Sequence, residues 1–390
     1  MSMTTLRTVL PLALVTGTSM LAMDLYLPAV PALQVGLGIG VSQAQATVAV
    51  FLAGLAASQL LWGEALSRLG PLRCLQAGVT LLIATSLACA LAPGIELLLA
   101  MRLLQGVAAG AATVVAPPLV RATLPDEDAV KGLATISMVE AMVPAGGPLL
   151  GALLLPWVDW RGLFVAVAAV AALLLPFVVR IAPRQLPGLD RSVRAGYRDI
   201  LANRRFVRLL ASQALCVGAL LTFVASAPQL LVRVLGEPAA AFATLQVCGV
   251  AAFMTMASQS GRLSQRLGTA RAVQFGSAVQ LLASAALLVA STMDAVGFAG
   301  LAVFWAGFCG ALAVRGPAAV SDALDLPPAQ MGRASALLVL ALLAVSAAGT
   351  QAVAPFLDGD SVAPVALAML LMLLASGALV WRYPTPRVTS

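Results

Sequence analysis

The sequence contains no histidine and a single lysine, Lys131, and charged residues make up only 10% of its 390 residues. An average soluble domain has about 25% charged residues, so this chain cannot cover a water-exposed surface. Without histidine, any proton chemistry must use carboxylates. Because Gly132 follows the only lysine, the phosphate-binding loop Gly-x-x-x-x-Gly-Lys-Ser/Thr cannot occur. These absences argue against an ATP-driven pump and against an enzyme.

Cysteines are few and scattered through apolar segments, and no pair has the Cys-x-x-Cys spacing of a metal or redox site. We expect buried free thiols that pack as small hydrophobic side chains. No metal site or cofactor is predicted. The cysteines are Cys74, Cys89, Cys216, Cys248 and Cys309.

Apolar residues dominate what is present, at 61% of the chain with a mean hydropathy of +0.99. Short polar breaks divide the chain into twelve apolar stretches, each close to the ~20 residues that cross a bilayer. We therefore predict an all-α polytopic membrane protein, with 1–182 and 206–390 as six-helix bundles and 183–205 as a central loop. The first stretch is too long for a signal peptide and is interpreted as a retained helix. The predicted spans are 8–30, 44–66, 72–93, 97–122, 130–155, 161–182, 206–232, 240–263, 271–292, 296–321, 331–356 and 362–382.

The basic residues are distributed unevenly about this topology, with nineteen of the 23 on one side. The positive-inside rule places that side, and both termini, on the cytoplasmic face of the cell inner (plasma) membrane. The net charge of +7 is then explained by topology and anionic lipid rather than by nucleic acid. An interfacial helix within 189–210 is a further, structural interpretation. The nineteen are Arg7, Arg68, Arg73, Arg121, Lys131, Arg180, Arg184, Arg191, Arg194, Arg198, Arg204, Arg205, Arg208, Arg262, Arg266, Arg271, Arg333, Arg382 and Arg387.

One short loop sequence occurs twice in the chain. "GEALSRLGPLRCLQAG" at 63–78 and "GRLSQRLGTARAVQFG" at 261–276 agree at seven of sixteen positions when aligned without gaps, 198 residues apart. Both copies fall in the predicted cytoplasmic turn between the second and third spans of a six-span half. Two halves related by internal repetition are typical of secondary transporters.

Four further motifs stand in order along the chain: "MDLYLPAVPAL" at 23–33, "RLLQGVAAG" at 102–110, "AMVPAGGPLLGALL" at 141–154 and "DWRGLF" at 159–164. They resemble the first-, fourth-, fifth- and sixth-helix motifs of the major facilitator superfamily. Within it, they are similar to the twelve-helix drug:proton antiporters of the bicyclomycin/chloramphenicol-resistance type. The resemblance implies two pseudo-symmetric six-helix bundles, a small-molecule substrate and proton coupling.

Three ionisable residues of the first half are predicted inside the bilayer, where such groups are costly and usually functional. Asp24 and Arg102 lie at similar depth, roughly 24 and 22 Å from the cytoplasmic face, and an Asp24–Arg102 interaction would lower the cost of both. Glu140 is predicted near the midplane, where burial favours a neutral carboxyl. Together they are the candidates for proton coupling. The alternatives are a helix-end or Pro28-kink partner for Asp24, and a hydrogen-bonded buried acid for Glu140.

Other site assignments follow from the resemblance. Tyr26, Gln105 and Phe223 are the candidates for the substrate cavity. The antiporter motif of the fifth helix, with a plain packing role as the alternative, is thought to seal the protein against proton leak. Its residues here are Pro144, Gly147, Pro148 and Gly151.

The predicted cytoplasmic gate departs from the family pattern. The family usually has an Asp before the loop arginine, where this chain has Ser67 before Arg68, and Glu64 is a candidate substitute. Arg315 is assigned to the same gate, as a partner of Asp322, although a structural role is the stronger alternative. The other gate candidates are Gly63, Gly70, Arg73 and Arg121.

These patterns predict a monomeric proton-coupled transporter that exports small amphipathic compounds, with phenicol antibiotics as the leading substrate, by alternating access. Two alternatives remain. One is an exporter of a sugar or other endogenous metabolite on the same fold. The other is a non-transporting membrane sensor, which the missing gate Asp would suit.

Overall fold

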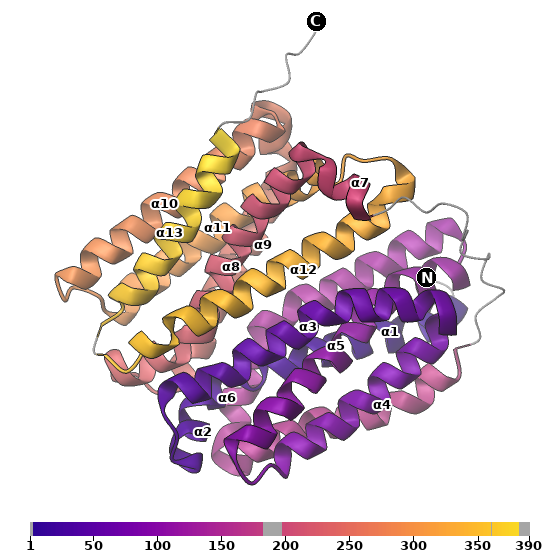
Figure 1. Ribbon diagram of the computed structural model, residues 1–390, viewed down its shortest axis with the longest axis horizontal. Helices are drawn as coiled ribbons and strands as arrows, with labels where there is room; N and C mark the ends of the chain where they lie inside the picture. Colours follow the sequence, from indigo (N-terminus) through magenta and orange to yellow (C-terminus); the bar gives the residue numbers. More distant parts are fainter. Residues whose placement is uncertain (1–2, 182–196, 360, 382–390) are drawn as a thin grey trace, which may run out of the picture. The chain divides into compact units, whose positions relative to one another are not determined.

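A computed structural model of the chain describes residues 3–181, 197–359 and 361–381 and is nearly all helical (Figure 1). The chain forms two compact units, Met1–Arg194 and Ala195–Ser390. Within the described residues, eleven helical segments are long and apolar enough to cross a membrane. One of them, α6, has 54 residues and is interrupted, so it is long enough to cross twice. This agrees with the twelve predicted spans and confirms the all-α polytopic fold.

Unit 1 packs six helices around a core of small and aliphatic side chains. Figure 1 shows α3 alongside α5 and α1 alongside α6, and α4 also packs on α5. A methyl group at Gly106 of α5 would overlap the Phe51 carbonyl of α3, so glycine lets these two backbones approach closely. The helices are α1 (Met3–Asp24), α2 (Val30–Leu37), α3 (Val41–Leu69), α4 (Pro71–Ala90), α5 (Ile95–Thr123) and α6 (Asp126–Val179).

The first apolar stretch is broken rather than continuous. α1 ends at Asp24, a 3-10 turn follows at Leu27–Ala29, and α2 then continues from Val30. Pro28 has no N–H to bond the Asp24 carbonyl, which explains why the α-helix ends at this residue. The sequence predicted one helix over 8–30; the structure places a break within it, directly after the acidic residue.

α6 is interrupted at Asp159, which has φ 54°. The Asp159 carboxylate accepts hydrogen bonds from the backbone N–H groups of Arg161 (2.6 Å) and Gly162 (3.2 Å), and so caps the second half of α6. The Arg161 guanidinium stacks 4.0 Å from the Trp160 ring and donates to the Ala92 carbonyl at 3.2 Å. The "DWRGLF" motif therefore builds the predicted boundary between two spans.

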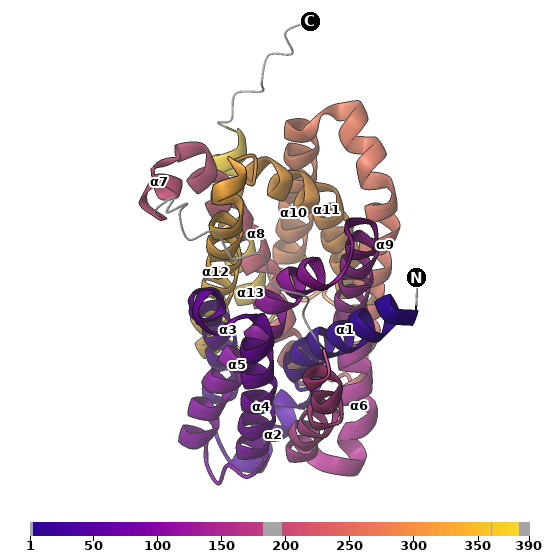
Figure 2. The same ribbon diagram turned by 90° about the vertical axis from the view of Figure 1, so that its right-hand side faces the viewer.

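Unit 2 repeats this helical arrangement. α11 packs against α9 and α10, and α8 packs against α12 and α13, as the turned view also shows (Figure 2). A π-helical turn, Leu230–Val234, extends α8. The helices are α7 (Tyr197–Ala202), α8 (Arg204–Gln229), α9 (Ala240–Leu267), α10 (Thr269–Thr292), α11 (Phe298–Ala323), α12 (Pro328–Val353) and α13 (Ala363–Trp381). Of the predicted central loop, 183–196 lies outside the described residues, and 197–202 is the helix α7.

Turn glycines show that the two units share one backbone plan. Gly70, between α3 and α4, has φ 78°, and Gly268, between α9 and α10, has φ 82°. Gly38 before α3 and Gly236 before α9 have φ 63° and 65°. Both pairs are 198 residues apart, the spacing of the repeated loop. Only glycine adopts these angles without strain, which explains its recurrence at these turns.

Candidate functional site

A buried arginine forms the centre of unit 1. Arg102 is fully buried, and its guanidinium donates to the Ala22 carbonyl (3.0 Å), the Thr47 carbonyl (3.2 Å) and Oε1 of Gln105 (2.7 Å). Its Nη2 is buried and has no hydrogen-bond partner among the described residues. All of these bonded partners are neutral, so no residue that the structure describes in unit 1 is a counter-ion for this cation.

Aromatic rings supply part of the missing compensation. The Arg102 guanidinium carbon lies 4.3 Å from the Phe51 ring centroid, 4.6 Å from that of Tyr26 and 5.6 Å from that of Phe164. Cation–π contacts of this kind stabilise a desolvated cation by about 2 kcal/mol or more. The rings come from α3, from the break after α1 and from α6, so the arginine ties these elements to α5.

Polar side chains extend the cluster to the neighbouring helices. Gln105 donates from Nε2 to Ser86 Oγ of α4 at 2.7 Å, and Cys89 of the same helix lies 3.9 Å from its Oε1. The Tyr26 hydroxyl lies 2.7 Å from Thr47 Oγ1. Tyr26 and Gln105, which were predicted to line the substrate cavity, are therefore buried members of the Arg102 cluster.

Asp24 lies beside this cluster but does not pair with the arginine. It is the last residue of α1, two residues beyond the carbonyl that Arg102 binds, and it is partly buried. Its carboxylate forms no hydrogen bond or ion pair with any residue in the described part of the chain. The expected Asp24–Arg102 ion pair is therefore absent from this structure, and the carboxyl ends the helix without a counter-ion.

Glycines of the antiporter motif pack against the helix break. A methyl group on Gly147 would come within 2.7 Å of Asp24 Cβ, and one on Gly151 would overlap the Leu25 carbonyl and lie 3.1 Å from Pro28 Cγ. The two glycines are one turn apart on α6, so they face the same side of the helix. The motif that contains Pro144 and Pro148 thus places α6 directly against Asp24.

Glu140 stands seven residues before Gly147 on α6. Two helical turns put it on the same face, about 10 Å from the Asp24 contact. It is partly buried and, like that of Asp24, its carboxylate forms no hydrogen bond or ion pair with another described residue. Glu140 therefore lies on the face of α6 that contacts Asp24 of α1.

Unit 2 has a cluster of aromatic side chains at the position where unit 1 has Arg102. Phe223, the third predicted cavity residue, is fully buried and stacks on Trp305 with ring centroids 4.6 Å apart. Phe304 meets it edge-on at 5.4 Å, and Phe308 extends the cluster. Trp305 is the eighth residue of α11, as Arg102 is of α5.

Arg315 is buried in unit 2. The sequence predicted that it pairs with Asp322, but in the structure it does not. Its Nη2 donates to the Ser212 carbonyl (3.1 Å), Ser212 Oγ (2.7 Å) and Ser376 Oγ (2.9 Å). Asp322 instead pairs with Arg205 of α8. This arrangement joins α8, α11 and α13 inside unit 2, in line with the structural alternative.

The predicted gate residues of unit 1 lie at the α3–α4 turn and at the end of α5. Arg68 pairs with Glu64 on the same helix at 2.8 Å, and both side chains are exposed. Arg73 and Arg121 are exposed, Gly63 and Gly70 have open space around them, and the side chain of Ser67 lies outside the described residues. The Glu64 carboxylate thus contacts the loop arginine locally.

Several members of the Arg102 cluster were not predicted. Thr47, Ser86 and Cys89 appeared in the sequence only as small residues inside apolar spans, and Phe51 as an ordinary lipid-compatible ring. The recurrence of polar residues at fixed depth on three helices was the available signal. Phe164 lies in a motif that had been recognised, but its contact with Arg102 depends on tertiary packing.

Comparisons with known proteins agree with this architecture. A family model described as Major Facilitator Superfamily matches residues 12–350. The multidrug resistance protein MdtL of Escherichia coli O157:H7 is 31% identical over 321 residues, covering 82% of this chain and 81% of its own length. MdtL of Escherichia fergusonii matches with the same identity and coverage.

Solved structures match over nearly the whole chain. A D-xylose-proton symporter has a TM-score of 0.75 at 14% identity, covering 97% of this chain and 98% of its own. The nucleoside transporter NupG has a TM-score of 0.73 at 13% identity, covering 96% and 98%. Together with the repeated turns and the matched family model, these likenesses identify the fold and the family: this multi-pass membrane protein belongs to the major facilitator superfamily of transporters.

Proposed function

We propose that the protein exports small amphipathic compounds, phenicol-like antibiotics first among them, in exchange for protons. Asp24 carries this proposal, because its carboxyl is partly buried at a helix break and has no counter-ion among the described residues. An ion pair holds a carboxyl in its charged form, whereas a carboxyl without a counter-ion takes up a proton more easily. Broken helices are also where transporters of other folds place their substrate and ion sites.

In the proposed mechanism, Asp24 and Glu140 take up and release protons. The transporter binds protons and substrate in turn, so that one leaves when the other binds. Arg102 holds the end of α1 through the Ala22 carbonyl, two residues before Asp24. Protonation of Asp24 removes an uncompensated negative charge from the end of α1, and this changes the position of the helix break. We assign the termini and the arginine-rich loops to the cytoplasmic side of an inner membrane. We propose that the protein transports as a monomer.

The name of the relative MdtL, a multidrug resistance protein, favours drug export over export of a cell metabolite. The test is drug accumulation in inverted membrane vesicles with an imposed proton gradient, using a panel of phenicols, other amphipathic drugs and sugars. We expect gradient-dependent uptake of at least one amphipathic drug. Uptake of sugars alone would indicate the metabolite exporter, and ligand binding without any accumulation would indicate a sensor.

A further inference from the structure

A short elbow in unit 2 folds over the ends of two other helices. It consists of α7, the turn at Asn203 and the first turn of α8. Ile200 and Phe206 of the elbow are buried against Ala334 of α12. Leu324 and Leu326, from the connection between α11 and α12, pack against the same cluster. The elbow therefore covers the point where α11 ends.

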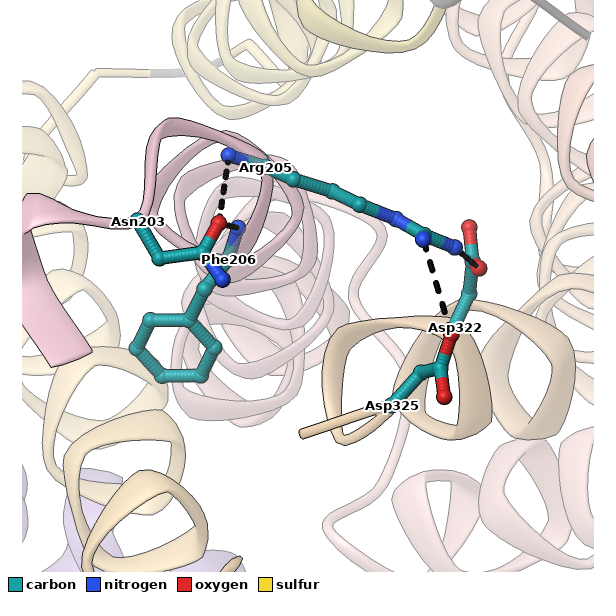
Figure 3. A network of polar contacts seen from close by, with 5 residues as sticks. All are labelled: Asn203, Arg205, Phe206, Asp322 and Asp325. Carbon is teal, nitrogen blue, oxygen red and sulfur yellow. Dashed lines mark hydrogen bonds and ion pairs between the residues drawn. The ribbon is translucent and has the colours of Figure 1, made fainter. Parts of the chain in front are cut away.

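Arg205 of the elbow also binds the end of α11 directly, as Figure 3 shows. The Asn203 side chain accepts hydrogen bonds from the N–H groups of Arg205 (3.0 Å) and Phe206 (3.2 Å), which caps α8 and fixes the direction of Arg205. The guanidinium then reaches Asp322, and Asp325 at 3.5 Å. One side chain thus holds both carboxylates at the end of α11.

A second contact joins the same two helices deeper in unit 2. Arg315 of α11 binds Ser212 of α8, as described above. Ser212 is seven residues after Arg205, and Arg315 is seven residues before Asp322. The two contacts are therefore about 10 Å apart along antiparallel helices, and α11 is attached to α8 at two levels.

Pro317 lies between these two attachments. It has no N–H for the Ala313 carbonyl, so α11 lacks one helical hydrogen bond where the chain passes from the inner contact to the outer one. The inner contact is fully buried, whereas the side chains of Arg205 and Asp322 are 45% and 19% exposed. The outer contact is open to solvent ions and is the weaker of the two.

We propose that residues 318–326 form a hinged segment at the predicted cytoplasmic end of unit 2. Pro317 is its hinge, the Arg315–Ser212–Ser376 contact its fixed base, and Arg205 the strap that holds it against α8. Release of Arg205 leaves the segment held by apolar packing at Ala318, Ala319, Leu324 and Leu326, so it opens more often without unfolding the rest of α11. If the protein transports as proposed above, this segment is the part of unit 2 that moves at the cytoplasmic opening.

Hydrogen–deuterium exchange on the purified full-length protein, without substrate, tests the strap. In Arg205→Gln, we expect amides of 318–326 to exchange roughly three- to tenfold faster, in line with the loss of a partly exposed ion pair. Amides of 299–312 should be unchanged. Arg204→Gln is the matched control, since Arg204 is an adjacent exposed arginine that forms no ion pair with any described residue.

Two further measurements separate the strap from a general loss of stability. The charge-reversed pair Arg205→Asp with Asp322→Arg should restore slow exchange, and high salt should speed exchange of 318–326 in the wild type but not in Arg205→Gln. Unchanged exchange in Arg205→Gln, or an equal rise along all of α11, would overturn the proposal. Because no substrate or gradient is used, this result is independent of whether the protein transports drugs.

Discussion

The two units have one backbone plan and different chemistry. The glycine turns recur 198 residues apart with nearly identical angles. The same spacing relates Asp24 to Thr222. Packing supports the equivalence, because a methyl group at Gly147 would meet Asp24 and one at Gly349 would overlap Thr222. Unit 1 thus has a titratable carboxyl at the position where unit 2 has a neutral hydroxyl.

The contrast extends to the fourth helix of each unit. Arg102 and Trp305 occupy the same place counted from the start of α5 and α11. The former organises a polar cluster, and the latter stacks among phenylalanines. The arginine of α11 lies ten residues further along, at Arg315, where it joins helices together. The difference teaches that a shared backbone plan does not fix the side chains: Asp24 and Glu140, the two carboxyls proposed above to exchange protons, both lie in unit 1.

The largest effect is expected when Asp24 of unit 1 is replaced by threonine, the residue at the equivalent position of unit 2. Asp24→Thr should abolish proton-driven drug uptake into inverted vesicles, because the hydroxyl cannot exchange a proton at neutral pH. Thr222→Ala is the counterpart variant and should retain uptake. If Asp24→Thr transported with an unchanged proton dependence, the functional difference between the units would be refuted.

A methyl group at the helix break should disturb the carboxyl without removing it. Gly151→Ala forces a Cβ onto the Leu25 carbonyl, and we expect a loss of about 1–3 kcal/mol in unfolding free energy, together with reduced uptake. Thermal unfolding in detergent measures the first effect. Gly146→Ala is the control, since no neighbouring atom lies within 4 Å of a Cβ there. Equal stability of the two variants would contradict the packing assigned to Gly151.

Arg315→Gln examines the arginine of unit 2. Loss of its donors leaves the Ser212 carbonyl and two hydroxyls without their charged partner, at a cost of about 1–3 kcal/mol. The same unfolding assay should show a lower melting temperature, whereas the exposed Arg262→Gln should change stability by less than about 0.5 kcal/mol. A melting temperature equal to the wild type would argue against a structural role for Arg315.

The shared backbone plan predicts equal costs at equivalent turns. Gly70→Ala and Gly268→Ala should each destabilise the protein by about 1–3 kcal/mol, because both positions need a conformation that only glycine adopts freely. Gly63→Ala, at the start of the repeated loop, has open space and should cost less. A large cost at one turn and none at the other would break the equivalence of the units.

The smallest effect is expected at the exposed pair before the α3–α4 turn. Glu64→Gln removes an ion pair between two exposed side chains, so the change in stability should stay within about 1 kcal/mol and vanish at high salt. Chemical unfolding at low and high ionic strength checks this. A larger, salt-resistant loss would mean that Glu64 supports the turn in the way that the missing loop Asp was thought to do.

Much of the fold could be predicted because it follows from composition and repetition. Apolar length set the spans, and the repeated loop revealed the two halves. The break after Asp24 was present only as an alternative, the helix end or Pro28 kink, because a proline kinks some membrane helices and ends others. A helix was predicted within 189–210, and α7 lies there at 197–202, but its bounds could not be predicted, since a six-residue helix has too few positions for a periodic pattern.

The site was predicted in its residues more than in its contacts. Asp24, Arg102 and Glu140 stood out because charge is rare in apolar spans. Their pairing could not be read from depth alone, because rotation about each helix axis decides which group a side chain meets, and Arg102 meets the Ala22 carbonyl instead of Asp24. The pairing of Asp322 with Arg205 depends in the same way on contact between helices distant in sequence.

The most direct test of the account is proton release from the purified protein on addition of a transported drug. In weakly buffered solution, the wild type should release protons when the drug binds, and Asp24→Asn should release none while remaining folded and inserted. Proton release from Asp24→Asn equal to that of the wild type would contradict the claim that this unpaired carboxyl exchanges its proton for substrate.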